Sequence, residues 1–268
     1  MVDVEFDFTS DSPGYWDRFW ENNDGLGGGG SDPDSASVVL QRYNQELWSK
    51  ELPNGEKMEL ALGENGSLSW NGFRFGSDSI ITSFRYKRQR ALLEQVAESM
   101  DDYRGFVEDF LRKTYTIGGE IIFPKHARSI NQARGVNPLI CDRFDLTLEC
   151  IRRYYAGVSS PLHKVLCSDG AFFDLFGDFR GYVEFFLLQD LVSEDYSAVK
   201  FWNGWKDFSD NPIPQTVEGY LEFLEGEVEF VGRRNKWIEL KIKGDSNQRD
   251  VSVKKLLKVH NQSLKIRK

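Results

Sequence analysis

Apolar residues follow two different spacings in this chain, and the change between them limits what it can fold into. The runs "KMELAL", "SLSW" and "FRFG" within residues 57–76 are strand-like, and Asn71-Gly72 between the last two is a strong hairpin signal. "SIITSFRY" at 79–86 predicts a further strand. From about Gln89 onward apolar residues recur at helical spacing, and only the short buried run "GGEIIFP" interrupts them.

Strands and helices that occupy separate parts of a sequence are typical of the α+β class. We therefore predict a small antiparallel sheet from the N-terminal third and a short central strand, packed against a bundle of long helices. The helical pattern predicts helices over about 89–113, 142–155 and 171–192, the last of which could bend near Gly177 and Gly181, and another that begins near Pro214. Asp142 is the expected N-cap of the second.

The domain organisation follows from length, aromatic content and the distribution of charge. The chain has 268 residues, of which 14% are aromatic, and no linker interrupts residues 35–240. This favours one domain over 1–240, with an irregular acidic segment at its N-terminus. The net charge is −8, yet the residues from Lys241 onward carry +7, which leaves −15 on the first 240. A basic C-terminal tail over 241–268 could bind nucleic acid or an acidic protein partner, fold back on the acidic domain, or stay in solvent.

The sequence contains no sign of a membrane protein or of a disulfide framework. Its longest apolar run, "VEFFLLQDLV", is interrupted by charge and is far shorter than the ~20 residues of a membrane span. The first residues lack the features of a signal peptide, and the three cysteines have no zinc-site or disulfide spacing. We expect a cytoplasmic protein with no membrane contact.

The loop 124–138 gathers polar and cationic residues beside the start of the predicted 142–155 helix. Arginine offers a rigid fork of donors suited to phosphate, amides can position a base or sugar, and a helix N-terminus attracts anions. The pattern predicts a site for a phosphate-bearing ligand; the alternative is a surface loop braced by its own hydrogen bonds. The candidate ligand-binding residues in the loop are Lys125, Arg128, Asn131, Gln132 and Arg134.

Three further residues are candidates for catalysis. Asp145 and Glu149 are one helical turn apart, so they could act as acid and base or hold Mg²⁺. A metal site would need another carboxylate, for which Asp78 or Glu120 could serve; the alternative is an ion-paired helix face. His126 is the best single general-base candidate, although a lone loop histidine is more often a surface residue.

Asp78 follows a predicted hairpin strand, where loop-borne polar groups often form sites. We include it among the candidate ligand-binding residues, with hydrogen bonding within a turn as the alternative role.

Several long stretches resemble a family of uncharacterised bacterial proteins, a domain of unknown function. The stretches include "FRFGSDSI", "IGGEIIFP", "SINQARG" and "DRFDLTLECIRRYY". The resemblance covers nearly all of residues 1–240 and implies a bacterial intracellular protein, without implying an activity or a catalytic residue.

These observations leave two classes of function open. One is the binding of a nucleotide or a nucleic-acid end, with hydrolysis of a nucleotide or phosphodiester if the site is catalytic. The other is a toxin-like or regulatory protein–protein interaction module that performs no chemistry. The sequence does not decide whether the chain is an enzyme, and no cofactor other than Mg²⁺ is suggested.

Overall fold

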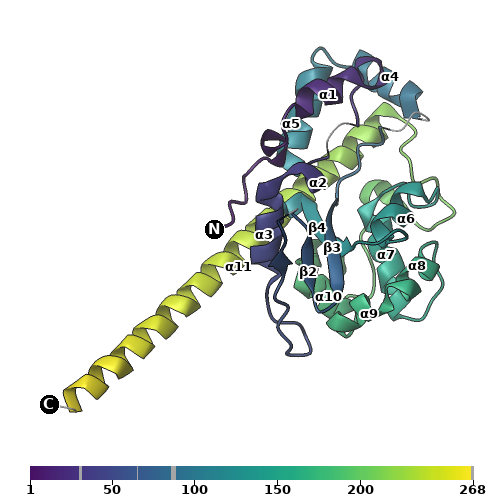
Figure 1. Cartoon of the computed structure of the whole chain (residues 1–268). Helices are drawn as coiled ribbons and strands as arrows, with labels where there is room; N and C mark the ends of the chain where they lie inside the picture. The colour runs from purple at the N-terminus through teal and green to yellow at the C-terminus, as the bar shows by residue number, and fades with distance from the viewer. Residues whose placement is uncertain (30–31, 65, 86–88, 267–268) are drawn as a thin grey trace.

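The chain folds around a small sheet that is covered by helices, in a computed structural model (Figure 1). The structure describes residues 1–29, 32–64, 66–85 and 89–266, and the side chains of 203 and 245–268 lie outside the described residues. The strands are β1 Ala61–Leu62, β2 Leu68–Trp70, β3 Phe73–Ser79 and β4 Glu120–Pro124. The helices are α1 Tyr15–Glu21, α2 Pro33–Ala36, α3 Val38–Trp48, α4 Arg90–Glu98, α5 Tyr103–Thr114, α6 Ile130–Val136, α7 Phe144–Tyr155, α8 His163–Ser168, α9 Gly170–Phe173, α10 Phe179–Phe186 and α11 Val217–Ile266.

The predicted α+β class is confirmed by this architecture. The strands form one antiparallel sheet in the order β1-β2-β3-β4. Asn71 and Gly72 both have positive φ, 45° and 83°, as a tight two-residue hairpin between β2 and β3 requires. The last two strands pair Asp78 with Ile121 and Ser79 with Glu120, although α4 and α5 lie between them in the chain.

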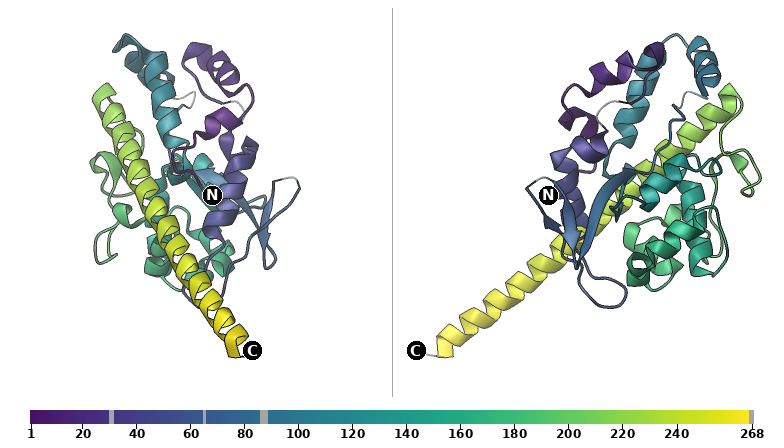
Figure 2. Two further views of the ribbon diagram at one scale, coloured as in Figure 1. Left: turned by 90° about the vertical axis from the view of Figure 1, so that its left-hand side faces the viewer. Right: turned by 45° about the vertical axis from the view of Figure 1, so that its right-hand side comes forward.

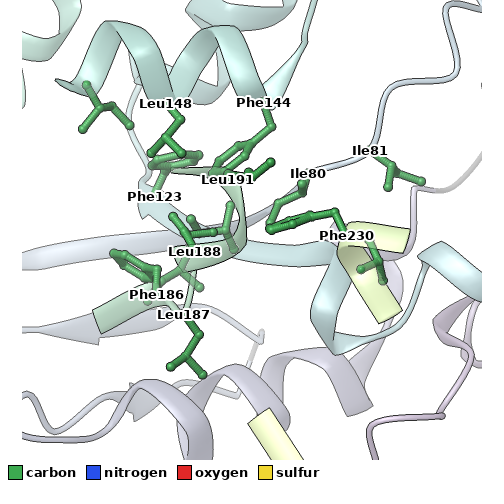
Figure 3. Close-up of a cluster of buried hydrophobic side chains, with 14 of the residues drawn as sticks. Ile80, Ile81, Phe123, Phe144, Leu148, Phe186, Leu187, Leu188, Leu191 and Phe230 are labelled. Carbon is green, nitrogen blue, oxygen red and sulfur yellow. The ribbon is translucent and has the colours of Figure 1, made fainter. Parts of the chain in front are cut away.

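Alternation along β3 and β4 sends neighbouring side chains to different helices. Ser77 accepts hydrogen bonds from Asn44 (2.7 Å) and Gln41 (3.2 Å) of α3, whereas Asp78 binds Arg134 of α6. Phe123 of β4 lies in a cluster of buried apolar side chains with Phe144 and Leu148 of α7 (Figure 3). Ser77 therefore faces α3 on one side of the sheet, whereas Asp78 and Phe123 share the other side with α6 and α7.

The end of α5 and the start of β4 are fixed closely against α11. A Cβ on Gly118 would lie 2.6 Å from the carbonyl oxygen of Val231, and one on Gly119 would lie 1.9 Å from that of Thr114. The Gly118 amide donates to Asn235 (2.7 Å) on α11. Only glycine permits this approach, which places Glu120 at a fixed point at the start of β4.

α11 is much longer than the body it packs against. Its first half lies along α5, and its C-terminal half extends away from the body in all three views (Figures 1 and 2). The helix continues without a break through residue 241, where the sequence analysis places the end of the domain. Among the described helices, none combines the length and apolarity needed to cross a membrane.

Several elements differ from the sequence predictions. The acidic N-terminal segment, expected to be irregular, contains α1, and α6 forms inside the predicted loop. The helix expected over 89–113 is divided into α4 and α5, because Asp102 caps a new helix by accepting the Gly105 amide. The helix expected over 171–192 is divided into α9 and α10, with Gly177 at a φ of 76° between them. α7 begins after Arg143 rather than at Asp142, and residues 80–85 form no strand.

Candidate functional site

A cavity of about 790 Å³ opens between α2, α3, β3 and the loop after β4. Hydroxyl and amide groups make up much of its wall, including Ser35, Ser77, Gln41 and Asn131. Two cations, Arg42 and Lys125, and the carboxylate of Glu64 also line it, and neither cation makes an ion pair within the part of the chain that the structure describes. A volume of this size is typical of pockets for small molecules.

Asp34 brings a carboxyl group to the wall of this cavity. The short helix α2 begins with Asp32 as its N-cap and Pro33 in its first turn, an arrangement that fixes the direction of the chain. One oxygen of Asp34, Oδ2, accepts the backbone amide of Ser79 (3.0 Å). Its other oxygen, Oδ1, is buried without a hydrogen-bond donor among the described residues.

Glu120 lies directly behind Asp34 at the start of β4. It is fully buried, and neither of its carboxyl oxygens meets a donor in the described chain. Burial raises the pKa of Glu120 well above its usual range, and the nearby Asp34 raises it further. Burial also raises the pKa of Asp34, followed by repulsion from Asp32 and Asp78.

The side chains of Asp34 and Glu120 are near enough to shift each other's pKa, and they could share a hydrogen bond only where one of them is protonated. As two carboxylates they would both be acceptors, which explains why Glu120 otherwise has no partner. Both pKa values are raised, so the fold favours the protonated form of each group. Asp34 lies in the cavity wall with Glu120 buried behind it, which makes Asp34 the member of the pair that could exchange a proton with a ligand.

Contacts within the protein hold Lys125 and the polar side chains of the cavity wall in place without a ligand. The Lys125 amide donates to the carbonyl of Arg74 (2.8 Å), and its side-chain stem covers Gly76, where a Cβ would lie 3.2 Å from Cδ. Gln41 donates to the carbonyl of Asp34 (2.8 Å) in addition to Ser77. The bonds from Gln41 tie α2, α3 and β3 together beneath the cavity.

Comparison with known proteins gives one match over most of the chain. The family model described as "Family of unknown function (DUF6994)" matches residues 2–238. The chain belongs to this family. No curated protein and no solved structure matches it. The expected membership of a family of unknown function is thereby confirmed, and the cavity described above lies wholly within the matched residues.

The loop that the sequence analysis singled out in this DUF6994 chain does not form a single site. Lys125 and Asn131 line the cavity beside Asp34, whereas Arg128 and Gln132 line a second groove between α6 and α8. The guanidinium groups of Arg128 and Arg134 consequently do not gather at the start of α7. Arg128 precedes α6 and is exposed, whereas Arg134 lies within α6 and is buried beside Asp142.

Arg134 is a supporting residue, because it is fully buried. Its guanidinium donates to Asp78 Oδ2 (2.7 Å) and to the carbonyls of Ser79 and Asp142. Burial raises the pKa of Asp78, and the charge of Arg134 lowers it in part. Asp78 and Arg134 thus hold the end of β3 beside Asp34 and Glu120 and are not placed to contact a ligand themselves.

His126 is paired with a buried carboxylate. Its Nε2 contacts Asp169 Oδ1 (2.6 Å), and its Nδ1 accepts the backbone amide of Arg128 (3.3 Å). Both ring nitrogens are engaged, so in this conformation neither is free to take a proton from a ligand.

Asp145 and Glu149 hold the helices together. Asp145 is fully buried and binds Arg143 while accepting the amide of Trp202 (3.1 Å). Glu149 accepts Nε of both Arg152 and Arg153 (2.7 Å each), which is the ion-paired face that the sequence analysis left as the alternative. Both carboxylates lie on the inner side of α7, away from the cavity residues.

No group of three or more His, Cys, Asp or Glu side chains in the described chain is arranged to hold a metal ion. The suggested convergence of Asp145, Glu149, Asp78 and Glu120 on Mg²⁺ is therefore absent there. The basic tail proposed as a partner surface has side chains that lie outside the described residues beyond Gly244.

Asp34 and Arg42 were not among the site residues predicted from the sequence. Asp34 stands 86 positions before Glu120, so nothing local in the sequence indicates that the two meet. Glu120 did carry a signal: a charged residue at the first position of the apolar run "EIIFP" is unusual unless it has a partner or a function.

Proposed function

We propose that this chain binds a nucleotide or another sugar-linked phosphate in the cavity beside Asp34, and that Asp34 and Glu120 provide the acid and base for its hydrolysis. The observation that carries the proposal is the Asp34 carboxyl group, with the buried Glu120 behind it, in the wall of a cavity whose two cations make no ion pair with any described residue. Buried groups with strongly raised pKa values in a concave site are candidates for catalysis.

The charges of the cavity favour one orientation of such a ligand. The carboxyl pair would repel a phosphate and accept hydrogen bonds from sugar hydroxyls, whereas Arg42 and Lys125 would neutralise the phosphate. The hydroxyl and amide groups of Ser35, Gln41 and Asn131 suit the polar part between these two ends. In the reaction, the protonated member of the pair would protonate the leaving group and its partner would accept a proton from water.

Titration calorimetry and thermal unfolding with AMP, ADP, ATP and adenosine test the binding step. A phosphate-bearing ligand at about 100 times its Kd should stabilise the fold by about 2.7 kcal/mol, and adenosine should bind more weakly. Arg42→Ala and Lys125→Ala should each weaken binding by about tenfold or more. Lys200→Ala, which removes an exposed cation remote from the cavity in sequence, serves as the matched control.

The chemical step is tested separately by phosphate or base release. Asp34→Asn should retain ligand binding and lose turnover by a factor of about 10² or more, because general acid–base catalysis contributes about that much. If neither Arg42→Ala nor Lys125→Ala weakens binding, the ligand assignment is refuted. Full turnover by Asp34→Asn would refute the catalytic assignment while leaving the binding proposal standing.

A further inference from the structure

A second concave surface lies between α6 and α8, and it shares no wall residue with the cavity beside Asp34. The groove measures about 700 Å³. Apolar side chains make up part of its wall: Ala133 and Val136 from α6, and Leu162 and Val165 at and after the start of α8. The two helices pack together, and Asn137 Nδ2 donates to the carbonyl of Pro161 (3.2 Å) to join the segments that follow and precede them. The groove is therefore formed without a ligand.

The charged residues of the groove are cations only. Arg128 and Lys164 line it, both are exposed, and no acidic residue takes part in its wall. Neither cation forms an ion pair with any residue that the structure describes, whereas Arg152 and Arg153 of the neighbouring α7 both bind Glu149. Such cations are unexpected here, because the first 240 residues carry a net charge of −15 and acidic side chains are in excess.

Apolar surface extends beyond the groove itself. Val136 is 83% exposed in its wall, and two further large apolar residues are exposed nearby in the chain, Leu139 (44%) and Val158 (48%). Leu139 follows the groove residue Asn137 by two positions, and Val158 precedes Pro161 by three. Exposed apolar side chains in and next to the segments that form a groove are more typical of a protein-binding surface than of a small-molecule site.

We infer that the α6–α8 groove is a docking site for an acidic segment of a partner protein that also carries bulky apolar side chains. The apolar side chains of the segment would fill the floor around Val136 and Val165, and its carboxylates would meet Arg128 and Lys164. Charge complementarity of this kind speeds association and fixes orientation, while the apolar floor supplies most of the affinity. Nucleic acid fits less well, because a phosphate backbone gains nothing from the apolar floor.

Selection from a phage-displayed library of random 12-residue peptides on the full chain tests the inference. Enriched peptides should combine Asp or Glu with Leu, Ile, Phe or Trp, and fluorescence anisotropy should show their affinity falling as salt is raised. Val136→Asp and the double variant Arg128→Glu/Lys164→Glu should each weaken binding by tenfold or more. These positions are exposed, so the variants should keep the melting temperature of the parent.

The double variant Lys200→Glu/Lys206→Glu is the matched control, because it changes the net charge by the same amount at two other exposed lysines. It should bind the selected peptides nearly as well as the parent chain. Failure to enrich any peptide, enrichment of basic peptides, or equal binding by parent and Arg128→Glu/Lys164→Glu chains would overturn the inference. Displacement of bound peptide by decanoate would support the apolar side chains of the groove as the contact.

Discussion

At the scale of single residues, the main feature of this molecule is a fully buried glutamate without a cationic partner. Arg234 donates to the backbone carbonyl of Glu120 (2.7 Å), but no cation contacts its carboxylate in the described chain. Burying a carboxyl group in such a place costs far less free energy when the group is neutral than when it is charged. The energetic cost of its ionisation is therefore a property that can be measured in solution.

Glu120→Gln should change how stability depends on pH. The folded pKa of Glu120 lies above the unfolded value, so its neutral form contributes stability that is present below pH ~4.5 and is lost as the pH rises through the folded pKa. Glutamine cannot ionise. We expect the variant to match the parent near pH 5 and to exceed it by about 1–3 kcal/mol at pH 9, measured by urea unfolding.

Glu222→Gln makes the same chemical change at an exposed position of α11 and is the control. It should leave the pH profile of the parent unaltered. A Glu120→Gln chain that loses stability equally at every pH would mean that the carboxyl group is ionised and stabilising in the fold, contrary to the shared proton.

At the scale of elements, one buried arginine joins the sheet to the helices beside it. Arg134 of α6 binds Asp78 on β3 and the carbonyl of Asp142 just before α7. One guanidinium group thus joins β3 to the consecutive helices α6 and α7, and the position of Asp34 against Ser79 depends on the same strand end.

Arg134→Met should destabilise the fold by about 3–5 kcal/mol, because it leaves Asp78 without its partner. Adding Asp78→Asn should recover part of that loss, since the uncompensated charge is then removed.

Arg112→Met is the control. It removes a half-exposed salt bridge with Glu108 and should cost no more than about 1 kcal/mol. Denaturant midpoints of the four chains check this. Equal costs for the two arginines would show that Arg134 is not a structural tie.

Comparison at this scale also shows what the sequence can specify. Asn71-Gly72 sets its own hairpin because the signal is local, and the run "EIIFP" is a strand as predicted. Arg134 looked like a ligand-binding residue because its partner Asp78 lies 56 positions away, and such pairings leave no local mark. The same reasoning applies to Asp34 and Glu120: their residue types were visible, but the contact between them arises only from the tertiary fold.

At the scale of the whole molecule, α11 joins two regions of different character. Its first half packs against α5 and the start of β4, and the buried Arg234 donates to the carbonyls of Gly118 and Glu120 there. Its second half extends away from the body (Figure 2). The match to the family also ends at residue 238, close to the point where the helix leaves the body.

Ending the chain after Gly244 should therefore leave the fold intact, because the buried contacts of α11 among the described side chains precede that point. Tyr220, Phe230 and Ile238 are all buried and all remain in the shortened chain. We expect a melting temperature within about 2 °C of the parent and unchanged binding at the Asp34 cavity. Ending it after Phe230 removes Arg234 and Ile238 and should instead abolish cooperative unfolding, as followed by circular dichroism. If the chain that ends after Phe230 unfolds as cooperatively as the chain that ends after Gly244, the sheet does not need this part of α11 to hold Glu120 in place.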